Sequence, residues 1–211
     1  GCGKSTLLKI ISGLLAKTSG TMNVIGHEVT GPLSDVGMGF QAPVLPKWRN
    51  VIDNVMLPVE ILGLDEEEYR KRAMELLELT GLTGFETKFP RELSGGMQQR
   101  VSISRALIHD PPLLLMDEPF GALDALTREA MNLELLRIWQ EKKKTCLLIT
   151  HSIGEAVFLA DRVIVMTPRP GKVDKVIAID LPRPRTAEMR LDLKFIEYVK
   201  EIQERIGLVR I

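Results

Sequence analysis

The runs LSGGMQQR (residues 93–100) and LLLMDE (residues 113–118) decide the fold of this chain. The second run predicts a buried strand, because its apolar residues follow one another without alternation after Asp110-Pro111-Pro112, which cannot continue a helix. In an open α/β sheet, ligands bind at the carboxyl end of such a strand. Asp117 can hold a magnesium ion at this end, with Glu118 directed at whatever the ion activates.

The first run predicts a tight turn that leads into a helix. Ser94, Gly95 and Gly96 are small, and apolar residues recur at helical spacing after them. Small residues at a helix N-terminus leave its free N–H groups and the positive end of its dipole accessible to an anion. Two features suited to binding phosphate, the strand end and this turn, therefore lie close together in the sequence.

A third phosphate-binding feature is GCGKST at residues 1–6, which matches the end of the G-x-x-x-x-G-K-[ST] phosphate-loop motif. Its glycines let the backbone curl so that N–H groups surround the phosphates. Lys4 places a positive charge on the β- and γ-phosphate oxygens, and the hydroxyl of Ser5 can bind Mg²⁺. The first glycine of the motif and the strand that leads into the loop are expected ahead of residue 1, so we expect the protein to have an N-terminal part beyond this sequence.

Composition narrows the class of protein. The chain has 211 residues, 45% of them hydrophobic, and no apolar stretch approaches the roughly 20 residues of a membrane span. Lys and Arg together number 28, as do Asp and Glu, so the net charge is zero. The excess of basic residues expected of a nucleic-acid-binding protein is therefore missing. The two cysteines indicate a reducing compartment rather than a disulfide framework.

Helical and extended patterns alternate along the chain, which predicts an α/β fold of the P-loop NTPase kind: a mainly parallel sheet flanked by helices, with an inserted α-helical subdomain. We expect residues 1–41 and 93–180 to form the nucleotide-binding core, 42–92 the helical subdomain, and 181–211 a linker and final helix. The expected helices cover residues 4–15, 127–142, 153–160 and 188–206. The expected strands cover 22–25, 36–40, 145–150, 162–167 and 173–179, with the last two completing the sheet.

Two further polar residues follow expected strands directly. Gln41 comes after the strand at 36–40, and His151 comes after the strand at 145–150. A single Gln or His in such a place is usually structural. Because the carboxyl ends of parallel strands meet at one edge of a sheet, we expect both side chains to join Asp117 and Glu118.

These motifs, in this order, resemble those of ATP-binding cassette ATPases, and LSGGMQQR is the most specific of them. The resemblance implies ATP and Mg²⁺ as ligands, with Glu118 as catalytic base, His151 on the γ-phosphate, and Gln41 sensing the metal and the attacking water. It implies metal binding by Ser5, Gln41 and Asp117. It further implies that two subunits, most simply a homodimer, share two sites. The nucleotide-binding residues would be Gly1, Cys2, Gly3, Lys4, Ser5 and Thr6 in one subunit and Ser94, Gly95 and Gly96 in the other, with Asp124 of the ALD motif at the seam.

Longer stretches at 42–58, 117–129 and 155–173 resemble the ATPase subunits of bacterial nitrate, sulfonate and taurine importers. The resemblance implies an import subunit on the cytoplasmic face of the bacterial inner membrane. Its partners would be an integral membrane permease and, indirectly, a solute-binding protein, with no nucleic acid. The alternative is a cassette ATPase that acts on DNA or ribosomes. A coiled-coil insertion, a second cassette or strongly basic segments would favour that alternative, and the sequence has none of these. A kinase or GTPase does not explain LSGGMQQR.

The segment 42–58 is the expected contact with the permease. It contains Leu45, Trp48, Val51 and Met56 and is interrupted by prolines at 43, 46 and 58. This pattern is poorly suited to an ordinary core helix. We expect it to line a groove that receives a short permease helix. The alternative is that Trp48 is buried and stabilises the helical subdomain.

Overall fold

The computed structural model describes residues 2–121, 123–142 and 144–207. At its centre is a parallel sheet in the order β3 (Val36–Gly39), β4 (Leu113–Asp117) and β5 (Thr145–Ile149). Leu115 on β4 is in register with Met38 on β3 and with Leu147 on β5. Strand β4 is buried from its first residue to Met116, which confirms that its unalternating apolar run marks a central strand.

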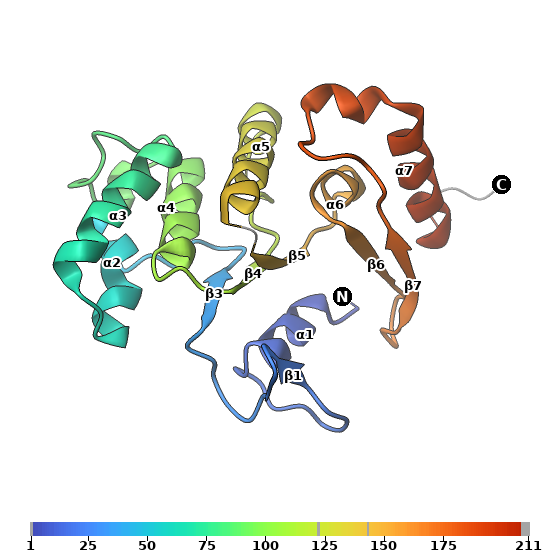
Figure 1. Ribbon diagram of the computed structural model, residues 1–211, viewed down its shortest axis with the longest axis horizontal. Coiled ribbons are helices and arrows are strands. Elements are labelled where there is room, and N and C mark those ends of the chain that lie inside the picture. Colours follow the sequence, from blue (N-terminus) through green and yellow to red (C-terminus); the bar gives the residue numbers. More distant parts are fainter. Residues whose placement is uncertain (1, 122, 143, 208–211) are drawn as a thin grey trace.

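Helices cover both faces of this sheet (Figure 1). Helix α1 (Lys4–Ile11) lies on one side, and α4 (Gly95–Leu107), α5 (Ala125–Lys142) and α6 (Ile153–Leu159) lie on the other. Leu8 of α1 is buried in a cluster with Leu115 and Ile149. Ile103 of α4 packs into a second cluster with alternate residues of β4, Leu114 and Met116. The layered α/β architecture predicted from the sequence is confirmed.

The remaining strands form two antiparallel pairs. Strands β1 (Asn23–Val24) and β2 (His27–Glu28) make a short hairpin, and β6 (Arg162–Met166) pairs with β7 (Val173–Ala178). We expected the last two strands to complete the main sheet, and that expectation is wrong. Within the described part of the chain, neither is hydrogen-bonded to β5, and residues of β5 and β6 line a cavity between the two sheets.

Helices α2 (Val51–Leu62) and α3 (Glu66–Leu79) form the inserted helical unit and pack on α4. Asp65 caps α3 by accepting hydrogen bonds from the N–H groups of Glu67 and Glu68. Asn50 caps α2 in the same way through the N–H of Asp53, at 2.9 Å. A short 3₁₀ helix, η1 (Pro90–Glu92), leads from this unit into α4.

The segment 42–58 corrects one expectation. From Val51 onward the segment belongs to an ordinary core helix, because α2 buries Val51 (1% exposed) and Met56 (3% exposed). Pro58 lies inside this helix. Packing on α3 and α4 therefore outweighs the backbone hydrogen bond that Pro58 forfeits. Trp48 instead is 79% exposed, so it is free to contact another protein.

Helix α1 is also shorter than expected. It ends at Ile11 rather than at residue 15, since the N–H of Gly13 bonds back to the carbonyl of Ile10 and Gly13 has a φ of 76°. Leu14 and Leu15 are consequently exposed rather than part of an apolar stripe.

The C-terminal segment folds onto α6. It comprises the 3₁₀ helix η2 (Ala187–Leu191) and α7 (Leu193–Arg205), where one helix was expected. The buried guanidinium of Arg185 donates hydrogen bonds to the carbonyls of Val157, Phe158 and Ala160 at the end of α6. Burial lowers the pKa of Arg185 to about 10. No helix among residues 2–121, 123–142 and 144–207 has the length and hydropathy to cross a membrane.

Candidate nucleotide-binding site

The phosphate loop leads directly into helix α1. Gly3 is the N-cap with a φ of 98°, and its carbonyl accepts the N–H of Leu7 at 2.9 Å. Lys4 is the first residue of the helix and is half-buried, with Nζ 3.6 Å from Sγ of Cys2. Ser5 and Thr6 are exposed. The predicted loop residues are thus placed at a helix N-terminus, where N–H groups and the dipole favour an anion. Gly1 lies outside the described residues.

Three predicted residues meet at the ends of the parallel strands. The side chain of Gln41, just beyond β3, donates from Nε2 to Oε2 of Glu118 at 3.2 Å. His151, just beyond β5, has Nδ1 3.1 Å from the same oxygen. The N–H of Glu118 is itself held by the carbonyl of Ile149 at 2.8 Å. The carboxylate therefore lies between an amide and an imidazole, on a backbone that is tied to the neighbouring strand.

Asp117 ends β4 and is half-buried, in register with Ile149. Among the described residues, no group of three or more His, Cys, Asp or Glu side chains could hold a metal ion. Mg²⁺ commonly keeps several waters and binds through one or two carboxylates together with substrate phosphates. Asp117, the hydroxyl of Ser5 and the amide oxygen of Gln41 are hard oxygen donors, so the residues present fit Mg²⁺ that is bound together with a nucleotide.

The Ser94-Gly95-Gly96 turn forms the exposed N-terminus of α4. Ser94 caps the helix by accepting the N–H of Met97 at 3.3 Å. No hydrogen bond in the described structure joins this turn to the phosphate loop of the same chain. Asp124 similarly accepts the N–H of Thr127 at 3.0 Å near the start of α5. Hydrogen bonds from Thr127 hold the pKa of Asp124 below its usual value, so this exposed carboxylate is charged at neutral pH. Ala122 of the same motif lies outside the described residues.

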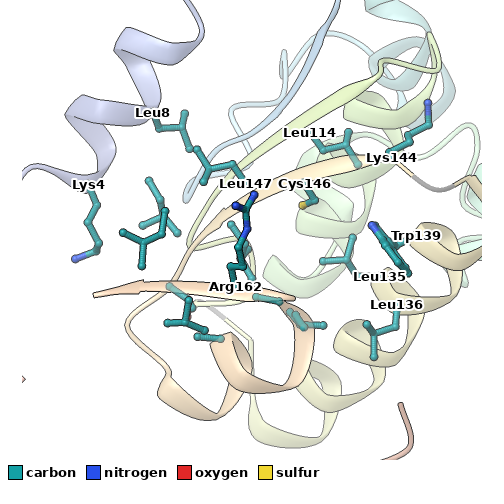
Figure 2. Close-up of a pocket in the computed structure, with 18 of the residues that line it drawn as sticks. Lys4, Leu8, Leu114, Leu135, Leu136, Trp139, Lys144, Cys146, Leu147 and Arg162 are labelled. Atoms are coloured by element: carbon teal, nitrogen blue, oxygen red, sulfur yellow. The ribbon is translucent and has the colours of Figure 1, made fainter. Parts of the chain in front are cut away.

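An apolar cavity of about 220 Å³ lies beside the phosphate loop, between β5 and β6 (Figure 2). Lys4 and Leu8 line it from α1, and Cys146 and Leu147 line it from β5. The apolar surroundings raise the pKa of the Cys146 thiol to about 12, although the side chain is partly open to this cavity.

Sequence reasoning missed two supporting residues. Gln99 in α4 is buried, and its Nε2 donates to the carbonyl of Phe40 at 3.2 Å, which fixes the backbone next to Gln41. Its amide looks like any polar helix residue, so the sequence carries no signal for this contact. Glu155 accepts the hydroxyl of Thr150 at 2.7 Å, and its N–H bonds to Ser152 at 3.3 Å. The Ser-x-x-Glu spacing of a capping box could have revealed this brace on either side of His151.

The comparisons with known proteins agree with this geometry. A family model described as ABC transporter matches residues 1–121. An uncharacterised ABC transporter ATP-binding protein of Methanocaldococcus jannaschii is 50% identical over 202 residues, which are 96% of this chain and 74% of the relative. The taurine import ATP-binding protein TauB of Jannaschia sp. is 50% identical over 99% of this chain and 78% of its own length. The nitrate import ATP-binding protein NrtD of a Synechocystis species is 46% identical over 96% and 78%.

A solved structure extends the comparison to three dimensions. It is a dimeric, post-hydrolysis ATP-binding cassette bound to ADP and Pi, with a TM-score of 0.75 and 33% identity over 86% of this chain and 82% of that one. The phosphate loop, the group formed by Gln41, Glu118 and His151, and the cassette fold together define an ATP-hydrolysing domain. The chain belongs to the ABC transporter family of ATP-binding subunits.

Proposed function

We propose that this ATPase powers the import of a small solute, of the nitrate, sulfonate or taurine kind, through a separate membrane permease. The observation that carries the proposal is the meeting of Gln41, Glu118 and His151 at the strand ends, on a cassette fold whose relatives TauB and NrtD are import ATP-binding proteins. In this proposal the protein is peripheral to the cytoplasmic face of the membrane. A cassette that acts on DNA or ribosomes has no observation in its favour.

The site's own residues divide the chemistry between them. Phosphoryl transfer depends mainly on positioning and on compensating charge. Lys4 and the loop N–H groups hold the phosphates, and Oε2 of Glu118 accepts the proton of the attacking water. Gln41 and His151, which both contact that oxygen in this structure, keep the carboxylate aimed and then contact the water and the γ-phosphate. Mg²⁺, held by Ser5, Asp117 and Gln41, would supply positive charge to the phosphate oxygens.

The second half of each site comes from a second copy of the chain. Ser94, Gly95 and Gly96 present an exposed helix N-terminus, which suits the γ-phosphate of a partner's nucleotide. The dimeric cassette among the solved structures supports this arrangement. Because the γ-phosphate then joins the two subunits, hydrolysis loosens the dimer and can drive movement in the permease.

The function is tested by growth on single nutrient sources. A strain that lacks the gene is expected to lose growth on nitrate as sole nitrogen source, or on taurine or an alkanesulfonate as sole sulfur source. The wild-type chain restores growth, and Glu118→Gln does not. Normal growth of the deletion strain on all of these sources, combined with unchanged uptake of each labelled solute, would contradict an import role for these solutes.

The permease contact is proposed around the exposed apolar residues of α2 and the segment before it. Trp48 is 79% exposed, Ile61 is 74% exposed and Val44 is 64% exposed. Arg49 ties the segment to α2 through two hydrogen bonds to Glu60, of 2.6 and 2.8 Å. Val44 and Ile61 also line a cavity of about 380 Å³ between β3, α2 and α4. We propose that a short amphipathic helix of the permease docks here.

The test uses residues that the fold does not need. Trp48→Ala with Ile61→Ala is expected to keep the thermal unfolding temperature and basal ATPase rate while losing co-purification with the permease. The matched control is Leu191→Ala, which removes an equally exposed side chain (82%) near the C-terminus. Val51 is unsuitable because it is buried in the helical core. Unchanged co-purification of the double variant would rule out this surface.

A further inference from the structure

The turn between β6 and β7 (residues 167–172) lies against the phosphate loop, although the two are far apart in the sequence. Cys2 lines one cavity, of about 440 Å³, together with Met166, Thr167 and Pro168. The two backbones come close together at Gly171. A β-carbon there would overlap the carbonyl oxygen of Cys2 and lie 3.1 Å from its carbonyl carbon. Ordinary contacts between carbon and such atoms are well above 3 Å, so only glycine lets the two backbones meet.

The turn is built to hold its shape. The N–H of Thr167 donates to the carbonyl of Lys172 at 2.9 Å. The hydroxyl of Thr167 donates to the carbonyl of Pro170 at 3.0 Å and accepts the N–H of Lys172 at 3.0 Å. The side chain of Thr167 therefore bonds to the residues on both sides of Gly171. These bonds hold the turn in one conformation against the phosphate loop.

The contact acts on an atom that matters for nucleotide binding. The carbonyl of Cys2 and the N–H of Gly3 belong to one planar peptide unit, so the position of the oxygen fixes the direction of the N–H. Gly3 is the N-cap of α1 with a φ of 98°. In the proposed site, its N–H is one of the donors that the loop offers to phosphate. A group that presses on the oxygen thereby turns the donor.

We propose that Gly171 and Thr167 are positioning residues for nucleotide binding: the turn supports the Cys2–Gly3 peptide and keeps the phosphate loop in its binding shape. This inference rests on the proposed nucleotide site. A methyl group at position 171 must displace the Cys2 carbonyl by about 1 Å or more, and a misplacement of about 1 Å can cost about 10²-fold in an enzyme's performance. The effect falls on ATP affinity and KM, because neither residue contacts the Gln41–Glu118–His151 group.

The experiment compares four variants of the full-length protein. Gly171→Ala is expected to weaken MgATP binding at least about tenfold and to raise KM with a smaller change in kcat. Thr167→Val, which removes the hydroxyl, is expected to weaken MgATP binding to a lesser degree. Thr167→Ser, which keeps the hydroxyl, is expected to bind MgATP with parental affinity. Gly31→Ala is the control, because a β-carbon at Gly31 meets no atom within 4 Å.

The readouts separate positioning from loss of structure. Thermal unfolding reports the fold, MgATP titration reports affinity, and the labelling rate of Cys2 reports the conformation of the loop. Parental affinity of a folded Gly171→Ala protein would overturn the proposal. If Gly171→Ala does not fold, the two Thr167 variants decide. Weaker MgATP binding by Thr167→Val together with parental affinity in Thr167→Ser supports the proposal, and equal affinities of the two variants overturn it. Lys4→Ala tests the site itself; if that variant binds MgATP normally, the proposed nucleotide site fails rather than the turn alone.

Discussion

Glu118 leaves strand β4 with a φ of 45°, a left-handed value that costs a residue other than glycine about 1–3 kcal/mol. The surrounding bonds maintain this conformation: its N–H is held by Ile149, and its own carbonyl accepts the N–H of Gly121 at 3.1 Å. The unfavourable backbone aims the carboxylate at Gln41 and His151. At the scale of single residues, the site is a carboxylate whose direction is set by its backbone conformation and by its contacts with Gln41 and His151.

Glu118→Gln tests that carboxylate. The amide keeps the size of the side chain but cannot take a proton from water, so turnover is expected to fall roughly 10²–10⁴-fold while ATP still binds. Steady-state ATPase assays and MgATP titration measure the two quantities separately. Hydrolysis at the parental rate would show that Glu118 is not the base, and lost binding would indicate a structural role instead.

The two thiols are expected to differ sharply in reactivity. Burial raises the pKa of Cys146 to about 12, so at pH 8 only roughly one part in 10⁴ is the reactive thiolate. Cys2 is partly exposed, with the ammonium of Lys4 3.6 Å from its sulfur. Maleimide at pH 8 should therefore label Cys2, block ATP binding, and be slowed by MgATP. Mass spectrometry of the labelled peptides checks this; labelling at Cys146, or labelling indifferent to nucleotide, would contradict it.

At the scale of elements, α4 links the two halves of the site. Its N-terminus carries Ser94 and Gly95, and one turn later buried Gln99 donates to the carbonyl of Phe40, directly before Gln41. A hydrogen bond between a helix and a strand end sets where Gln41 can point. One buried amide therefore connects α4 to the residue before Gln41, which contacts Glu118.

Gln99→Met tests this link. Methionine nearly matches the volume of glutamine but donates no hydrogen bond, so the Phe40 carbonyl loses its partner and Gln41 loses its fixed position. We expect kcat to fall about tenfold with ATP affinity nearly unchanged. The control is Gln98→Met, whose amide bonds the carbonyls of Pro90 and Leu93 rather than the strand end. Equal kcat for the two variants would show that the Phe40 contact does not matter for turnover.

Elements also show how far the sequence could be read. The ends of β4 and β5 were predictable because unalternating apolar runs are typical of strands in a parallel sheet, and the end of β3 was predictable from the short apolar stretch before Gln41. The carboxyl ends of parallel strands must meet, which brings Gln41, Glu118 and His151 together. Helix α2 was not predictable, because Pro58 reads as a helix breaker until packing on α3 and α4 is known. The contacts of Gln99 and Gly171 depend on tertiary approach and leave no periodic pattern in the sequence.

At the scale of the whole molecule, the proposed sites are complete only in a dimer. The Ser94–Gly96 turn is exposed and is not hydrogen-bonded to the described part of its own phosphate loop, whereas a solved relative is a dimer with ADP and Pi. Gly95 allows a precise test, because a β-carbon there meets no atom within 4 Å. Glutamate at this first helical position also suits the helix dipole, so the monomer should be as stable as the parent.

Gly95→Glu is expected to bind MgATP normally and yet lose ATPase activity and ATP-dependent dimerisation, because its charge meets the partner's γ-phosphate. Gly95→Ala, which adds no charge, is the control. Mixing Gly95→Glu with inactive Lys4→Ala then distinguishes sharing from action within one chain. If sites are shared, each mixed dimer has one site with both defects and one intact site. An equal mixture should then recover about a quarter of parental activity, since half of the dimers are mixed. Sites completed within a single chain would recover none, and that result in an ATPase assay of the mixture would refute the shared site.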